Sequence, residues 1–176
     1  AGPYVVDAFR VNHRVTCYGY RITIPRNGKF DVERARAQEI PQKFWSRLQK
    51  GETIEHEGRT LTPDMVLGEK RRGMVYCTDT RPVPVIAEYA EGADLFICEG
   101  MYGEKEKIAN ARENKHMMFQ EAAKLGKEAN PREMWLTHYS PSLMHPEEYL
   151  NEIREIFPKI KTARDGWSAE LGFDED

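Results

Sequence analysis

The sequence predicts an α/β domain, and three observations carry that prediction. From residue 74 onward, short apolar runs typical of buried strands (74–77, 94–98 and 134–138) alternate with helical patterns. Ahead of them, segments 3–11 and 15–24 show the alternation of half-buried strands around a short polar link. At 176 residues, the chain is also long enough to bury the core of one such domain.

The elements follow in order along the chain. The two N-terminal segments are expected to form a hairpin or a continuous bent ribbon. Residues 25–73 then become rich in charged residues, Pro and Gly, with plausible helices over 31–40 and 42–50. We interpret residues 25–73 as an inserted arm within a single domain that spans residues 1–176.

After the arm, helices are expected between and after the three buried strands. The segment 104–115 is too charged to predict more than a loop. Apolar residues recur at helical spacing in the following segment, and Pro146 suits the first turn of the last helix. The predicted helices are 83–92, 116–129 and 146–157.

Composition narrows the class of protein. With 26 Lys and Arg against 29 Asp and Glu, the net charge of −3 gives no global attraction to nucleic acid or membrane, so only a local basic patch could provide one. No apolar run reaches the roughly 18 residues of a membrane span, and no signal pattern opens the chain, so a cytoplasmic protein is expected.

Cys17, Cys77 and Cys98 show no CxxC spacing. We interpret them as reduced core thiols, with zinc ligation as the alternative.

Polar residues end the three predicted strands of the second half. Asp79, Glu99 and His138 stand at these positions, and ligands of open α/β sheets bind beyond the carboxyl ends of strands. His13 follows the first predicted strand, and His116 stands at the start of the helix predicted over 116–129. Histidine and aspartate suit zinc or manganese, and a carboxylate can bridge two such ions in a hydrolytic centre.

Each of these residues also has a structural interpretation. Asp79 could cap a turn or pair with Arg81, and Glu99 could accept hydrogen bonds from the backbone. His138 could hydrogen-bond a loop, His13 could be a structural histidine between strands, and His116 could cap a helix or lie at the surface. From the residues alone, a metal hydrolase and a set of structural polar side chains both stay open.

Four stretches taken together resemble ribonuclease Z of the metallo-β-lactamase superfamily, over nearly the whole chain and in the family's order. They are "VNHRVTCYGYRI", "VYCTDTRP", "KHMMFQEAAKLGKEA" and "WLTHYSP". The resemblance implies that His13, Asp79 and His138 bind metal, with Asp79 bridging two zinc or manganese ions. It gives His116 the family's proton-donor role, and Glu99 is the residue kept from the family's His-Glu-Ala-Thr motif, a second catalytic candidate.

The same resemblance implies an αββα sandwich of which this chain is the C-terminal half. It implies that the arm, residues 25–73, grips tRNA, with Lys43, Arg47 and Lys50 able to touch phosphates; a merely solvated helix face is the alternative. The sequence departs from the family at Met117-Met118 and in the arm, where the usual Pro-Pro-Gly-Pro is reduced to "IPQKF".

The family's His-x-His-x-Asp-His motif does not occur in the sequence. It belongs to an N-terminal half that would precede Ala1, so the metal site is expected to be incomplete here, and a homodimer is expected to cover the open sheet. The expected function is a metal-dependent endoribonuclease that cleaves precursor tRNA at its 3′ end with metal-activated water, this chain alone being inactive. The alternatives are a non-catalytic scaffold or dimerisation half, and a metallo-hydrolase of small phosphodiesters.

Overall fold

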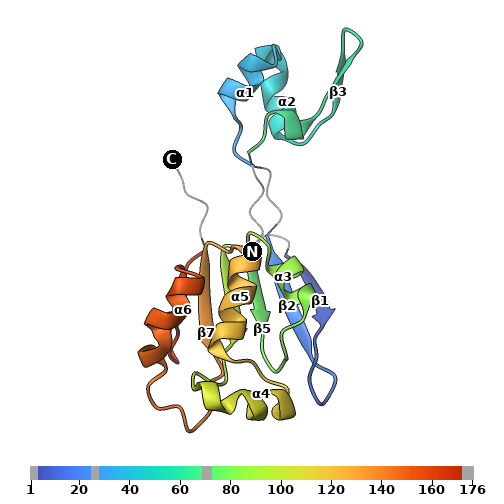
Figure 1. Cartoon of the computed structure of the whole chain (residues 1–176). Helices are drawn as coiled ribbons and strands as arrows, with labels where there is room; N and C mark the ends of the chain where they lie inside the picture. Colours follow the sequence, from blue (N-terminus) through green and yellow to red (C-terminus); the bar gives the residue numbers. More distant parts are fainter. Residues whose placement is uncertain (1–3, 25–27, 69–72, 172–176) are drawn as a thin grey trace. The chain divides into compact units, whose positions relative to one another are not determined.

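The computed structural model describes residues 4–24, 28–68 and 73–171, and the chain divides into two compact units (Figure 1). Unit 1 combines Ala1–Ile24 with Arg72–Asp176, and unit 2 is Pro25–Arg71. Unit 2 thus falls where the sequence predicts an inserted arm. Residues 25–27 and 69–72, at the two ends of that arm, lie outside the described residues.

Unit 1 is built on a six-stranded sheet with the order β1-β2-β5-β6-β7-β8. Its strands are β1 (Val5–Arg10), β2 (Tyr18–Thr23), β5 (Met74–Cys77), β6 (Leu95–Glu99), β7 (Glu133–Thr137) and β8 (Ile160–Thr162). The first three strands pair antiparallel, and β5 through β8 pair parallel. Parallel pairing brings the carboxyl ends of β5, β6 and β7 to one edge of the sheet.

Helices cover one face of this sheet (Figure 1). They are α3 (Pro84–Ala90), α5 (Phe119–Ala129) and α6 (Leu150–Ile156), with the 3-10 turn η4 (Pro146–Tyr149) leading into α6. Helix α4 (Ile108–Asn114), which follows the 3-10 turn η3 (Lys105–Lys107), lies below the end of the sheet in Figure 1. Phe119, Ala122 and Leu125 of α5 are buried at helical spacing, and they share one core with Val75 and Phe96 of the sheet. This core fixes α5 on the sheet beside the edge described above.

The opposite face of the sheet exposes aromatic side chains. Tyr20, Tyr76, Ile97 and Trp135 are partners across neighbouring strands and form one row. Trp135 is 8% exposed and meets Trp167 in an edge-on contact with centroids 5.4 Å apart, whereas Tyr20 and Tyr76 are each 42% exposed. The end of the row on β2 and β5 is therefore a solvent-facing apolar surface.

Unit 2 has a small core of its own. Its elements are α1 (Val32–Ala37), η1 (Gln42–Phe44), α2 (Trp45–Gln49), β3 (Ile54–His56), β4 (Arg59–Leu61) and η2 (Pro63–Met65). Asp31 caps α1 by accepting a hydrogen bond from the backbone of Arg34 at 2.9 Å. Leu48, Leu61 and Val66 lie in the buried cluster that joins these elements.

The predicted α/β fold and the N-terminal hairpin are confirmed, and several local predictions are wrong or incomplete. Most of the segment 104–115, predicted as a loop, forms η3 and α4, and α4 buries only Ala111. The helix predicted over 116–129 begins at Phe119, and the first turn of the helix predicted over 146–157 is the 3-10 turn η4. Strand β8 and the β3–β4 hairpin were not predicted.

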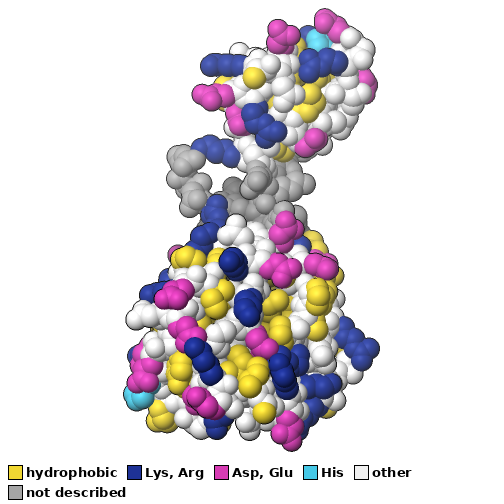
Figure 2. All heavy atoms as spheres, in the orientation of Figure 1, with side chains coloured by type: hydrophobic (Ala, Val, Ile, Leu, Met, Phe, Trp, Pro, Cys, Tyr) yellow, Lys and Arg dark blue, Asp and Glu magenta, His cyan; other side chains and the backbone are white. Residues whose placement is uncertain are grey.

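Surface charge is mixed on the face seen in Figure 2, where basic and acidic side chains intersperse on both units. This fits the nearly balanced composition and offers no single-sign field on that face. Within the ranges that the structure describes, no helix has the length and apolar character needed to cross a membrane.

Candidate metal centre

Three polar residues lie at the carboxyl ends of three neighbouring parallel strands. Asp79 comes two residues after β5, Glu99 ends β6, and His138 follows β7 directly. Asp79 and His138 have positive φ angles of 53° and 59°, a left-handed conformation that costs non-glycine residues on the order of 1 kcal/mol. Nε2 of His138 lies 3.2 Å from Oδ1 of Asp79. Paired strain of this kind is typical of functional sites.

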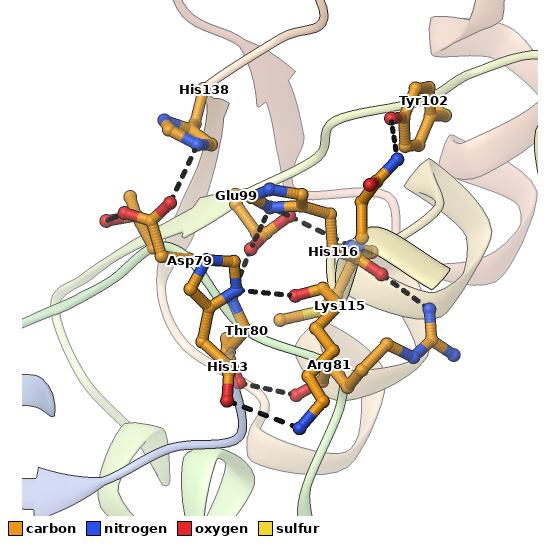
Figure 3. A network of polar contacts seen from close by, with 12 residues as sticks. His13, Asp79, Thr80, Arg81, Glu99, Tyr102, Lys115, His116 and His138 are labelled. Carbon is orange, nitrogen blue, oxygen red and sulfur yellow. Dashed lines mark hydrogen bonds and ion pairs between the residues drawn. The ribbon is translucent and has the colours of Figure 1, made fainter. Parts of the chain in front are cut away.

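His13 and His116 complete the cluster from other parts of unit 1 (Figure 3). His13 lies in the connection between β1 and β2, and His116 lies between α4 and α5. The ring centroid of His116 is 4.9 Å from that of His13 and 5.4 Å from that of His138. Ligand atoms of His13, Asp79 and His116 lie within 4.8 Å of one another, close enough to hold a metal ion.

Glu99 contacts this cluster from inside the protein. Its side chain has no exposed surface, and its oxygens accept hydrogen bonds from the backbone N–H groups of Thr80 at 2.5 Å and Met117 at 2.9 Å. Oε2 of Glu99 also lies 3.1 Å from Nδ1 of His116. Burial raises the pKa of Glu99 to about 7, although the two N–H donors favour the ionised form. Among the histidines of the cluster, Glu99 therefore hydrogen-bonds to His116.

Hydrogen bonds donated by Nδ1 orient the rings of His13 and His116. The carbonyl oxygen of Lys115 lies 3.1 Å from Nδ1 of His13; because a carbonyl only accepts, Nδ1 carries the hydrogen and Nε2 keeps its lone pair. Glu99 plays the same part for His116. Burial and the neighbouring His13 lower the pKa of His116, which favours the neutral ring. Neutral imidazoles with a nearby carboxylate fit the donor preferences of zinc, and the second partner at Nδ1 is typical of metal-bound histidines.

A further pair of residues holds the loop that carries His116. Arg81 forms an ion pair with Glu121, with side chains 17% and 21% exposed, and donates to the carbonyl oxygen of His116 at 2.5 Å. Glu121 accepts a hydrogen bond from the backbone of Met118 at 2.9 Å, at the start of α5. No role for Glu121 was predicted from the sequence; a glutamate three residues into a helix is the signal that could have found it.

Some of the structural interpretations hold and others do not. Arg81 pairs with Glu121 rather than with Asp79, and Met118 rather than His116 stands at the N-cap of α5. Glu99 does accept backbone hydrogen bonds, as its structural interpretation predicts. The metal-binding and catalytic roles assigned from the sequence stay predictions, and what the structure adds is that these residues lie together.

The cysteines take no part in the cluster. Cys17, Cys77 and Cys98 are free, and the last two are buried in the core. Burial raises the pKa of Cys77 to about 12, so this side chain is a protonated thiol at neutral pH.

The arm residues predicted to touch tRNA all belong to unit 2. Nζ of Lys43 lies 4.8 Å from the ring centre of Phe44. Nε of Arg47 lies 2.7 Å from a carboxylate oxygen of Glu52, with both side chains about half exposed at 52% and 47%. Lys50 is exposed at the C-cap of α2. The positive charge of Arg47 is thus partly balanced within the unit.

A family model described as a beta-lactamase superfamily domain matches residues 5–139, a range that includes every residue of the cluster. The chain belongs to the beta-lactamase superfamily. Relatives of this superfamily member include a protein named ribonuclease Z from Lachnoclostridium phytofermentans, 60% identical over 98% of this chain and 58% of the relative. One of the same name from Agathobacter rectalis is 55% identical over the same shares. The chain therefore spans a little under three fifths of the length of these relatives.

Solved structures agree on the fold of this superfamily member. The metallo-beta-lactamase fold protein YhfI from Bacillus subtilis superposes with a TM-score of 0.60 at 22% identity, covering 95% of this chain and 49% of that one. Human tRNase Z, short form, gives a TM-score of 0.52 at 17% identity, with 97% and 44% covered. The metallo-β-lactamase fold predicted from the sequence is confirmed.

Proposed function

We propose that this chain contributes to a metal-dependent endoribonuclease of the ribonuclease Z type, which cleaves precursor tRNA at its 3′ end. The observation that carries the proposal is the grouping of His13, Asp79, His116 and His138 at the carboxyl edge of the sheet. Imidazole and carboxylate donors gathered at a strand edge suit the hydrolysis of phosphodiesters. The name shared by its relatives supports RNA as the substrate.

In this proposal Asp79 would be the ligand shared by two ions, and His13 and His138 would each supply a ligand to one of them. When bound, two zinc or manganese ions lower the pKa of a water molecule and neutralise charge on the phosphodiester. His116 would deliver a proton from Nε2 to the leaving 3′ oxygen once its ring is protonated, a form that the Glu99 carboxylate at Nδ1 would stabilise. Glu99 would orient His116 rather than touch the substrate itself, because its buried carboxylate has no contact with solvent.

The proposed donor set is small for two ions. His13, Asp79 and His138 supply two ligands to each ion with Asp79 shared, whereas catalytic zinc sites usually have three protein ligands. We therefore expect the isolated chain to bind metal weakly and to cleave precursor tRNA little or not at all. The complete activity needs ligands beyond those three.

Isothermal titration with zinc tests the proposal. His138→Ala is expected to weaken binding at least tenfold, whereas His145→Ala, whose side chain is 66% exposed outside the cluster, leaves it unchanged. Equal zinc affinity in both variants would overturn the assignment of the cluster. Efficient cleavage of precursor tRNA by the isolated chain, lost in His138→Ala, would instead overturn only its expected inactivity.

The arm has its own part in the proposal. Lys43, Arg47 and Lys50 contact tRNA phosphates, supported by the exposure of all three side chains in unit 2. The exposed pair between Arg47 and Glu52 does not prevent this, because such pairs contribute only about 0–1 kcal/mol.

The open sheet face favours a second candidate function, self-association. Tyr20 and Tyr76 are direct partners on β2 and β5 and are each 42% exposed, a surface that a second copy of the chain could cover. Light scattering after size exclusion is expected to show a dimer that Tyr76→Lys dissociates. A monomer at high concentration would contradict this candidate.

A further inference from the structure

A pocket of about 310 Å³ opens beside the metal-ligand cluster. The rings of His13 and His116 form its border with the cluster. The rest of its wall is lined by four polar residues and two apolar ones, namely Arg14, Tyr102, Asn114, Ser140, Met101 and Pro141. They come from the β1–β2 connection, the segment after β6, the end of α4 and the loop after β7. The roles proposed above use none of the four polar residues.

Arg14 gives the pocket an anchored positive charge. One guanidinium nitrogen of Arg14 donates to the carbonyl oxygen of Glu113 at 3.1 Å and to Oδ1 of Asn114 at 2.5 Å. A guanidinium offers five N–H donors, and these two bonds account for only part of that capacity. No carboxylate occurs among the described residues that line the pocket, so its wall favours an anion.

Tyr102 gives the pocket a flat aromatic wall on a fixed backbone. The carbonyl oxygen of Tyr102 accepts a hydrogen bond from the backbone of Phe119 at 2.8 Å, and its hydroxyl lies 3.5 Å from the amide nitrogen of Asn114 (Figure 3). Aromatic rings stack on any nucleobase. The amide of Asn114 and the hydroxyl of Ser140 can pair with the polar edge of a base.

The size of the pocket limits what can enter it. Its volume lies at the low end of the range for small-ligand sites, about 300–1,000 Å³, which leaves room for one nucleotide rather than for a duplex. Its border with His13 and His116 places such a nucleotide next to whichever phosphodiester lies at the cluster.

We propose that this pocket binds one nucleotide of single-stranded RNA beside the scissile phosphodiester, with Arg14 on its phosphate and Tyr102 on its base. The inference rests on the proposed ribonuclease function and extends it. Metal ions bound at the cluster would attract any phosphodiester, and the pocket would fix which bond of the strand reaches them.

Binding without cleavage tests the pocket. The probe is a fluorescein-labelled tetraribonucleotide with 2′-O-methyl groups, titrated with the chain in EDTA at several salt concentrations and followed by anisotropy. Arg14→Gln is expected to raise the Kd about tenfold and to reduce the salt slope by about 0.7, the value for one phosphate neutralised on a single strand. Arg132→Gln removes the same charge at the other end of β7, where Arg132 pairs with Asp94, and is expected to change neither quantity.

Tyr102→Leu separates stacking from charge. It is expected to weaken binding about tenfold with an unchanged salt slope, because stacking on an aromatic ring displaces no counterion. Thermal melting of each variant checks that it is folded, and a folded Arg14→Gln chain is sufficient for the test.

The outcomes distinguish this inference from the function on which it rests. If Arg14→Gln behaves like Arg132→Gln, or if the wild-type chain does not bind the oligonucleotide, the pocket inference is overturned. Loss of zinc affinity in His138→Ala would still support the ribonuclease proposal in that case. If His138→Ala leaves zinc binding unchanged, the proposed function itself fails.

Discussion

Nδ1 of His116 lies 3.1 Å from a carboxylate oxygen of Glu99, and Glu99 has no exposed side-chain surface. A buried carboxyl group is costly unless hydrogen bonds satisfy it, and the backbone N–H groups of Thr80 and Met117 provide two of them. The same side chain therefore stabilises two loops and orients the ring of His116. Stability and site geometry are linked at this pair.

Glu99→Gln should destabilise the protein, because it replaces one of the two accepting oxygens of this carboxylate by an NH₂ group. The amide keeps the shape but puts a donor where one oxygen now accepts, so a buried N–H group is left unpaired at a cost of about 1–3 kcal/mol. We expect the free energy of unfolding in urea to fall by that amount. Glu128→Gln, on the exposed side of α5, is the control and should change it by less than about 0.5 kcal/mol. Equal stability of the two variants would contradict the hydrogen-bonding role of Glu99.

Arg81→Met should remove the contact that holds the loop of His116. The variant leaves Glu121 without its partner, and we expect a loss of about 2 kcal/mol, less than for a fully buried pair because both side chains are partly exposed. Adding Glu121→Leu should recover part of this loss, but not all, because Glu121 also bonds the backbone of Met118. A double-mutant cycle by urea denaturation measures the coupling, and strictly additive losses would exclude it.

Gly19→Ala tests the packing of the hairpin that carries His13. A Cβ atom on Gly19 would lie 2.3 Å from the ring of Phe9, which is buried and stacked on Tyr89 with centroids 4.4 Å apart. Because this ring cannot yield without unpacking, we expect a loss of about 1–3 kcal/mol in calorimetry. In a Phe9→Leu background the same change should cost clearly less. A similar cost in both backgrounds would mean that the clash is relieved elsewhere.

The sequence was sufficient to predict those features of the fold and the site that depend on a local pattern. Alternation identified the hairpin, and the rule for carboxyl ends of strands brought Asp79, Glu99 and His138 to one edge. Strand β8 was not predicted, because a strand of three residues with Lys161 in the middle is too short to show an apolar pattern. Helix α4 was not predicted, because it buries only Ala111 and so has no apolar stripe at helical spacing.

Contacts between side chains of distant segments could not be predicted from the sequence patterns. Nothing local shows that Glu99 is fully buried, or that Arg81 turns to Glu121, 40 residues away, rather than to Asp79. Arg47 was interpreted as available for phosphates, yet it pairs with Glu52, five residues on, across the end of α2. Such pairings follow from tertiary packing, which a reading of periodicity does not contain.

Removing the arm should leave unit 1 folded. The arm leaves and rejoins unit 1 between β2 and β5, where Ile22 pairs with Met74, so that Thr23 and Gly73 lie side by side. Replacing residues 24–72 by Asn-Gly would close a two-residue hairpin between these strands. Because the two units have separate cores, we expect one cooperative unfolding transition and an unchanged zinc affinity, both measured on the shortened chain.

The same shortened chain should bind tRNA less tightly. Deleting Lys43, Arg47 and Lys50 removes the charges that neutralise up to three phosphates. Taking the value for B-DNA, the slope of log affinity against log salt should fall by about 0.9 for each of these phosphates. A chain with all three residues changed to Gln should reproduce most of the decrease in affinity, which would assign it to these side chains rather than to the shape of unit 2. Unchanged tRNA affinity in the shortened chain would show that unit 2 does not bind tRNA.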